Sequence, residues 1–171
     1  MKNGIIIIFT CFVFCSCQKS NKMGFIDNVK LVNGYQEKID IQSSLQAKIK
    51  LYEQKRDSVR QAFQIEINEA ELRSRKMSQA NLQKLSQELQ QKDQVITQRD
   101  QFEQQQIAQE SQKQNDSLLK KVKDFVRNYG LTNGYDFILG SNEAGSVMFG
   151  KSENDLTQII LEALNNAYKN N

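Results

Sequence analysis

The sequence contains no proline, no tryptophan and no histidine, and only 8 of its 171 residues are glycine. Without histidine, the chain cannot build a histidine-based metal site or a histidine-dependent catalytic triad. Low glycine content and an apolar fraction of 39% indicate an elongated, mostly helical chain rather than a packed enzyme domain. The formal net charge of +3 is too small for a dedicated nucleic-acid binder. We therefore expect no catalytic residues, no metal, no cofactor and no nucleic-acid partner.

All three cysteines lie within the first 17 residues, in the stretch MKNGIIIIFTCFVFCSC. Lys2, an apolar run over residues 5–14 and then small residues make the layout of a secretory signal, and the run is too short to span a bilayer comfortably. Ser16-Cys17 resembles a bacterial lipobox, which predicts cleavage before Cys17 and a lipid on its side chain. No other cysteine would then remain, as suits an oxidising compartment. A plain signal peptide without a lipid is the alternative.

A short ordered element follows a polar linker. The stretch MGFIDNVKLVNGY predicts a strand around Phe25 and then a helical turn that Asp27 or Asn28 can cap. A lone strand is not stable by itself, so this strand needs a partner elsewhere in the chain or in another chain.

From Gln36 to Asn128 there is no glycine, and helix-forming residues dominate, so we expect roughly ninety residues of helix. Apolar residues recur at steps of three and four in two series of similar length, which is typical of a coiled-coil seam. The first series contains Leu45, Ile49, Tyr52, Val59, Phe63, Ile67, Ala70 and Met77. The second contains Leu82, Leu85, Leu89, Ile96, Ile107, Leu118, Val122, Phe125 and Tyr129.

The break between the two series contains Ser78 and Asn81, two candidate helix caps. It lies near the middle of the helical region, so the sequence predicts a hairpin of two antiparallel helices with its tip near residues 78–81. At about 1.5 Å per residue, each arm would be roughly 65 Å long. One continuous helix of twice that length is the alternative, because no glycine or proline marks the turn.

The second helix is poor in apolar residues and has fourteen glutamines between Gln79 and Gln114. Polar residues at Lys92, Arg99 and Glu103 stand on the seam where leucine would each bury apolar surface worth about 1.5–3 kcal/mol. Such an arm should bend, and its scattered apolar side chains can touch many different chains weakly. The candidate contact residues are Phe63, Met77, Val95, Phe102 and Ile107. Composition alone favours the plainer interpretation, a solvated spacer.

Basic residues gather close to the expected tip, at Arg73, Arg75, Lys76 and Lys84. Such a cluster is commonly just a solvated helix end. Alternatively, it can meet anionic lipid headgroups or an acidic partner, since each basic residue contributes about 1 kcal/mol beside a charged surface.

The C-terminal part predicts a small β/α unit. We expect the long helix to end at Gly130 in a left-handed conformation, followed by a hairpin of the strands YDFILG and SVMFG. A last helix, opened by Asn154 or Asp155, carries an amphipathic stripe. The candidate residues of this head are Phe25, Tyr135, Phe137, Leu139, Val147 and Phe149. If the arm returns the chain to its start, three short strands meet, and their small core favours association of several chains.

This order of elements resembles the Skp family, also called OmpH-like, of periplasmic chaperones. The most specific parts of the resemblance are Asp27 with Tyr35, Tyr135-Asp136 opening the second strand, and Asp155-Leu156-Thr157 opening the last helix. The resemblance implies a homotrimer with a small β-rich head and three helical arms around a cavity. It also implies that the cavity holds unfolded outer-membrane proteins without ATP, so that they do not aggregate in the periplasm.

The expected fold class is therefore mainly α with a small β head, in which a long antiparallel helical hairpin joins a trimeric β-rich body. The expected divisions are a lipoprotein-type signal peptide over 1–16, a linker over 17–22, an association head over 23–34 and 130–171, and an arm over 35–129. The residues after Cys17 lack an acidic cluster, which favours a periplasm-facing anchor in a diderm bacterium. The alternative function is a structural or adaptor lipoprotein whose coiled coil spans part of the periplasm.

Overall fold

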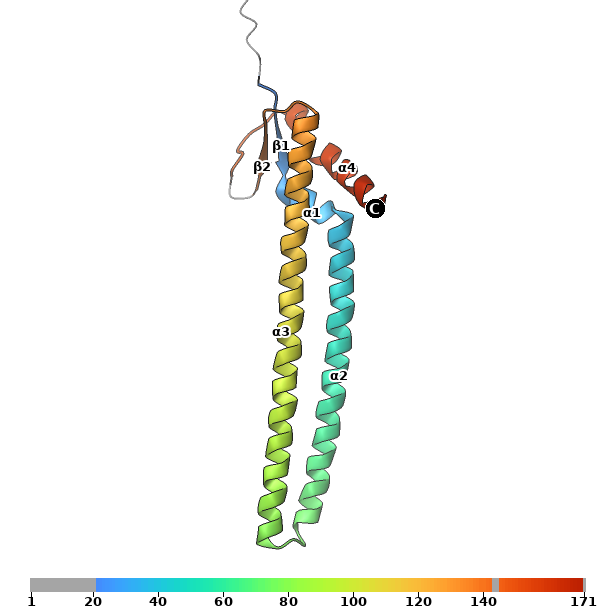
Figure 1. Ribbon diagram of the computed structural model, residues 1–171, viewed down its shortest axis with the longest axis vertical. Helices are drawn as coiled ribbons and strands as arrows, with labels where there is room; N and C mark the ends of the chain where they lie inside the picture. The colour runs from blue at the N-terminus through green and yellow to red at the C-terminus, as the bar shows by residue number, and fades with distance from the viewer. Residues whose placement is uncertain (1–20, 143–144, 171) are drawn as a thin grey trace, which may run out of the picture.

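The computed structural model describes residues 21–142 and 145–170, so Cys17 and the expected signal peptide lie outside the described residues. Two long antiparallel helices extend from a small head that holds both strands and the two shorter α-helices (Figure 1). The elements are β1 (Met23–Asp27), α1 (Asn28–Gly34), α2 (Gln36–Ser74), α3 (Gln79–Thr132), β2 (Phe137–Ser141), the 3₁₀ helix η1 (Ser152–Asn154) and α4 (Thr157–Lys169). The predicted fold class, mainly helical with a small β head, is confirmed. No helix among the described residues has the length and apolar character needed to cross a bilayer.

The two strands are parallel neighbours, with Phe25 of β1 opposite Leu139 of β2. Parallel strands need a long crossover between them, and here the whole helical hairpin is that crossover. Asp27 ends β1 and caps α1, because its carboxylate accepts the backbone N–H groups of Val29 and Lys30 at 3.0 Å each. The predicted strand around Phe25 and the cap at Asp27 are therefore confirmed.

The predicted second strand of a C-terminal hairpin, SVMFG, is wrong. Residues 145–150 form no strand, Val147 is only half-buried, and Phe149 is 86% exposed. The chain after residue 150 pairs with the far edge of β1 instead. Phe25 forms a parallel bridge with Asp155, and its carbonyl accepts the N–H of Leu156 at 2.9 Å. After β2 the chain therefore crosses to the opposite edge of β1 instead of folding back on β2.

The long helix α3 also ends later than predicted. Gly130 is buried inside the helix, and a Cβ there would lie 3.3 Å from the Ile138 side chain. The left-handed residue is Gly134, with φ of +70°. Gly130 thus serves a close approach between α3 and β2, whereas Gly134 supplies the turn.

The hairpin turn comprises residues 75–78, slightly before the predicted tip. Of the two predicted candidate caps, Ser78 caps α3, because its hydroxyl accepts the N–H of Asn81 at 3.5 Å. The alternative of one continuous helix is therefore wrong.

The buried apolar core lies in the head, where the base of the arm meets β1, α1 and α4. Its buried members are Ile26, Leu31, Tyr35, Leu118, Val122, Leu156, Ile160 and Leu164. The amphipathic stripe predicted for the last helix supplies three of them: Leu156, just before α4, and Ile160 and Leu164 within it. Ile159 of the same helix is 53% exposed. Beyond the base of the arm, where Leu118 and Val122 join this core, Ala70 is the one buried apolar residue of the described arm. The head therefore holds most of the hydrophobic stabilisation of a single chain.

Candidate functional site

Ion pairs join the two helices of the arm along its length. Four Lys–Glu pairs cross from α2 to α3, and in every pair the two residue numbers add up to 158, so all four report one antiparallel register. The pairs are Glu37–Lys121, Lys48–Glu110, Lys55–Glu103 and Glu66–Lys92. They alternate with the half-buried apolar residues of the predicted seam. The arm is therefore held by charge pairing as well as by apolar contact.

The polar seam positions have partners across or along the arm. Glu103 accepts both Lys55 and Arg99 at 3.1 Å, and the hydrogen bond from Lys55 is the main cause that lowers the pKa of this carboxyl. Asp100 accepts the hydroxyl of Tyr52 and a guanidinium nitrogen of Arg60 at 3.2 Å. The Tyr52 hydrogen bond is the main reason why the pKa of Asp100 is lowered. Lys92, Arg99 and Glu103, which were predicted only to replace apolar residues on the seam, therefore form ion pairs.

The five candidate contact residues do not share one surface. Val95 and Phe102 are 63% and 60% exposed and lie seven residues apart on α3, hence on one face. Phe63, Met77 and Ile107 are half-buried. Only the first two are freely available to another polypeptide.

A matching apolar stripe on α2 was not predicted from the sequence. Leu51, Ile65 and Leu72 are each more than half exposed and are separated by multiples of seven residues. They stand outside the seam series, and their heptad spacing was the signal that could have identified them. With Val95 and Phe102, they form what we call the outward arm set.

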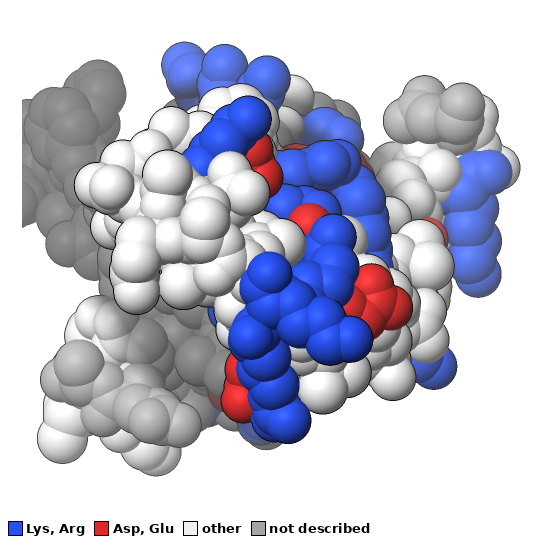
Figure 2. All heavy atoms as spheres, turned by 90° about the horizontal axis from the view of Figure 1, so that it is seen from below, with Lys and Arg blue, Asp and Glu red and all other residues white. Residues whose placement is uncertain are grey.

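The four basic residues near the hairpin turn are all exposed. In the view from the tip, Lys and Arg side chains cover much more of the surface than Asp and Glu (Figure 2). Lys84 lies 3.9 Å from Glu88, whereas Arg73, Arg75 and Lys76 form no salt bridge within the described residues. The tip therefore presents net positive charge.

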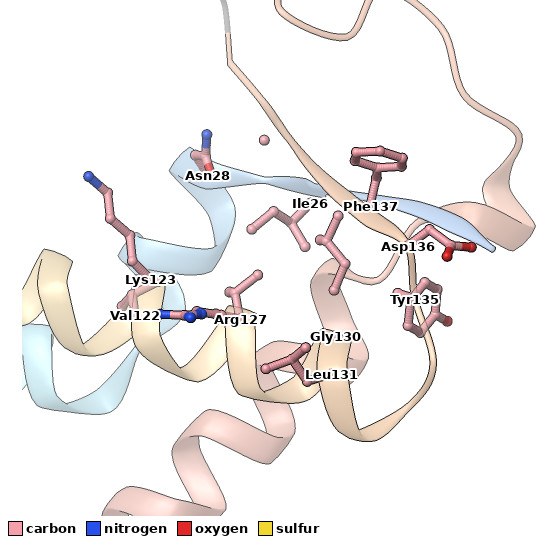
Figure 3. A pocket seen from close by; sticks show the side chains of 13 residues that line it. Ile26, Asn28, Val122, Lys123, Arg127, Gly130, Leu131, Tyr135, Asp136 and Phe137 are labelled. Atoms are coloured by element: carbon pink, nitrogen blue, oxygen red, sulfur yellow. The ribbon is translucent and has the colours of Figure 1, made fainter. Parts of the chain in front are cut away.

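The head contains a cavity of about 440 Å³ between β1, β2 and the end of α3 (Figure 3). Its walls are mainly apolar, and Lys123 and Arg127 of α3 line one side. Phe137 lines the cavity yet is 55% exposed, and Leu139 is 43% exposed. Two predicted head residues thus leave apolar surface uncovered in the single chain.

Two of the other predicted head residues, Tyr135 and Phe25, pack within the chain. The ring of Tyr135 stacks on Tyr129 with centroids 6.3 Å apart and carries the Lys22 ammonium 4.1 Å from its centroid. The ring of Phe25 lies against Gly150, where an added Cβ would come within 2.3 Å of it. These contacts fix both ends of the β region.

A polar cluster that was not predicted from the sequence joins the arm to the head. The hydroxyl of Tyr35 donates to Glu37 at 2.6 Å, and Lys121 pairs with the same carboxylate. Burial raises the pKa of Glu37, but these hydrogen bonds outweigh it and hold the pKa below its ordinary value. Burial, with the Glu37 hydrogen bond, strongly raises the pKa of the Tyr35 hydroxyl. The start of α2 is thus tied to α3 through one shared carboxylate.

Helix α4 also contacts the start of the arm, through residues that were not predicted from the sequence. Tyr168 of α4 packs edge-on against Tyr35, with centroids 5.9 Å apart, and donates to Asp40 of α2 at 3.0 Å. The described residues hold no group of three or more carboxylates and thiols arranged to bind a metal ion. The features that distinguish this chain are therefore its surfaces: a long arm with outward apolar side chains and a head with an open cavity.

Comparison with known proteins agrees with this architecture. The chain is 20% identical over 161 residues to the Chaperone protein Skp of Vibrio cholerae, covering 94% of both chains. Its fold matches the crystal structure of an OmpH-like protein from Caulobacter crescentus with a TM-score of 0.76, at 15% identity and over 86% of this chain and 85% of the other. The model of the family described as "Outer membrane protein (OmpH-like)" matches residues 22–164. The chain therefore belongs to the OmpH-like family of outer membrane chaperone proteins.

Proposed function

We propose that this chain is an ATP-independent periplasmic holdase that encloses unfolded outer-membrane proteins between helical arms and prevents their aggregation. The observation that carries the proposal is the outward arm set, five large apolar side chains spread singly along a hairpin. The Skp protein with which the chain aligns end to end is named a chaperone, which supports the same class of activity.

Spread contacts suit an unfolded client. An unfolded barrel protein exposes unpaired strand edges and apolar faces that other copies can join. A stripe of separate apolar side chains offers many weak contacts without fixing one geometry, so the client stays screened and can leave when it folds. A tight site would oppose release.

The proposal includes a homotrimer and a lipid anchor. Three copies would place three arms around one space and would cover the apolar surface left at Phe137 and Leu139. Cys17 would carry the lipid, and the exposed basic residues Arg73, Arg75 and Lys76 would face anionic headgroups or acidic clients at the far end of the arm.

An aggregation assay tests the holdase. A urea-unfolded outer-membrane barrel protein is diluted into buffer with the chain from residue 18 onward, and light scattering is followed. Near-stoichiometric protein should suppress scattering, and the L51S/I65S/L72S variant should need several-fold more protein. A control that changes three exposed glutamines of the arm, Q61S/Q90S/Q105S, should match the parent.

If the parent protein leaves the client to aggregate, the holdase proposal is wrong and the spacer function takes its place. If the control variant loses activity as much as the apolar variant, the outward arm set is not the contact surface.

A further inference from the structure

We propose that the outward arm set is a docking site for an amphipathic α-helix of a partner protein, with carboxylates beside its apolar stripe. The partner helix lies along the arm as a third helix beside α2 and α3. This goes beyond the proposed holdase activity, which concerns unfolded chains, because the partner is a regular helix of stated charge.

The two stripes of the outward arm set border neighbouring grooves between α2 and α3, which run side by side along the arm (Figure 1). Leu51 of α2 lines a groove of about 350 Å³, and Val95 of α3 lines a second groove of about 120 Å³. Lys55, one helical turn after Leu51, lines both grooves and pairs with Glu103, the residue after Phe102. Lys55 therefore lies between the two stripes, and a helix placed over it contacts both.

The border of the outward arm set is basic. Residues three or four positions from a member share its helix face, and among them the charged residues are Lys48, Lys55, Arg75, Lys76, Lys92 and Arg99, with Glu69 the one acidic residue. Four of these cations pair with carboxylates of the arm, and in each pair the cation is the more exposed partner. Arg75 and Lys76 are exposed and form no salt bridge within the described residues. The site thus presents positive charge beside its apolar side chains, which suits a partner that carries carboxylates.

The spacing within the outward arm set is that of a helical repeat. Ile65 and Leu72 are seven residues apart, as are Val95 and Phe102, which is about 10.5 Å along a helix. A partner helix with a seven-residue repeat presents apolar side chains at the same interval. An extended chain places successive side chains of one face about 6.6 Å apart, so its contacts fall out of step with the arm. The spacing therefore favours a helix over an extended segment.

The site also has a definite length. Leu51 and Leu72 are 21 residues apart on α2, or about 31 Å, which corresponds to three heptads of a partner helix. An isolated helix of that length is only marginally stable in water. A partner segment of this kind therefore gains helix as it docks, and its apolar residues take the positions along the groove.

A synthetic peptide tests the docking on the chain from residue 18 onward. The labelled peptide has three heptads, with leucine at the two apolar positions of each heptad and glutamate at the positions beside them. One control peptide has the same composition in scrambled order, and another has lysine in place of glutamate. Fluorescence anisotropy should show binding several-fold tighter for the heptad peptide than for either control. Helical circular dichroism of the mixture should exceed the sum of the separate components.

Variants of the chain locate the site. L51S/I65S/L72S should weaken binding of the heptad peptide by about tenfold, because it removes exposed apolar surface that the peptide would cover. The glutamine control Q61S/Q90S/Q105S should bind as the parent does.

A second pair of variants tests the charge of the border. R75Q/K76Q should weaken binding several-fold, because both cations are free to meet the glutamates of the peptide. K50Q/K120Q removes the same charge at exposed positions outside the border and should bind as the parent does. Both variants should keep the helical circular dichroism of the parent.

The outcomes separate this docking from the holdase. If the scrambled peptide binds as tightly as the heptad peptide, or if the peptide gains no helix, the partner is not a helix and the docking is wrong. If the L51S/I65S/L72S variant binds as tightly as the parent, the site lies elsewhere and the docking is again wrong. If the heptad peptide binds as expected while the parent leaves the barrel protein to aggregate, the docking stands and the holdase is wrong.

Discussion

Asn165 of α4 caps the start of the arm at Gln36, 129 residues earlier in the chain. The N–H of Gln36 donates to the Asn165 side-chain oxygen at 2.8 Å, and the Asn165 amide donates to the carbonyl of Gly34 at 3.2 Å. Tyr35, which precedes α2, makes no capping hydrogen bond through its own side chain. The C-terminal helix therefore completes the first turn of the arm and fixes its junction with the head.

Replacing Asn165 with alanine should loosen that junction. Loss of a helix cap costs about 0.5–2 kcal/mol, so N165A should lower the free energy of unfolding by about 1 kcal/mol. It should also speed hydrogen exchange in the first turn of α2. The neighbouring N166A, at an exposed position, is the control. Equal exchange in both variants would show that the cap is not needed.

Acidification should loosen the arm. The pKa values of Asp100 and Glu103 are lowered by Tyr52 and Lys55 respectively. A lowered carboxyl pKa stabilises the fold above the unfolded-state value, and this stabilisation is lost as the pH falls through the folded-state value. The ordinary values are 3.8 and 4.5, so the loss should begin near pH 4.5 and continue below it. Spin labels on α2 and α3 should show constant separation from pH 8 to 6 and a broader distribution below pH 4.5. An unchanged distribution at pH 3 would contradict the role of the ion pairs.

Exchanging the charges of one cross-arm pair should restore what a single reversal removes. K48E places two carboxylates together with Glu110 and should lower the thermal midpoint, whereas K48E/E110K should recover most of the loss. The expected coupling is a few tenths to 1 kcal/mol, because the pair is partly exposed. The reversal K50E, at an exposed residue that forms no salt bridge with any described residue, should have little effect. Equal loss in K48E and in the double variant would show that the pair does not contribute.

Gly24 should tolerate no side chain. A Cβ there would lie 2.4 Å from a methyl carbon of Leu156, which is buried in the head core. Overpacking of this kind costs about 1–3 kcal/mol, so G24A should lower the midpoint of chemical unfolding. M23A, at the exposed neighbouring position, should change it much less. A G24A midpoint equal to that of the parent would mean that the core yields easily.

Local patterns in the sequence predicted much of the fold. Steps of three and four identified the seam, and the caps Asp27 and Ser78 followed from their side-chain chemistry. The parallel pairing of β1 with β2, the tie at Asp155 and the Asn165 cap join residues more than a hundred positions apart. Such contacts depend on how the arm returns the chain, which no local pattern encodes.

The candidate site was predicted less completely. Val95 and Phe102 were predicted as contact residues and are exposed. Leu51, Ile65 and Leu72 were not predicted, because the steps of three and four that mark the seam do not include residues on its opposite face. The paired charges were missed because a one-dimensional pattern shows Lys92 or Glu103 as interruptions and not as partners.

The most direct test of the central claim is the mass of the particle that forms with a client. The chain from residue 18 onward is mixed with a urea-diluted outer-membrane barrel protein and passed through size exclusion with light-scattering detection. The account predicts one particle that contains three copies of the chain and one client. A monomeric chain that elutes apart from an aggregated client would contradict it.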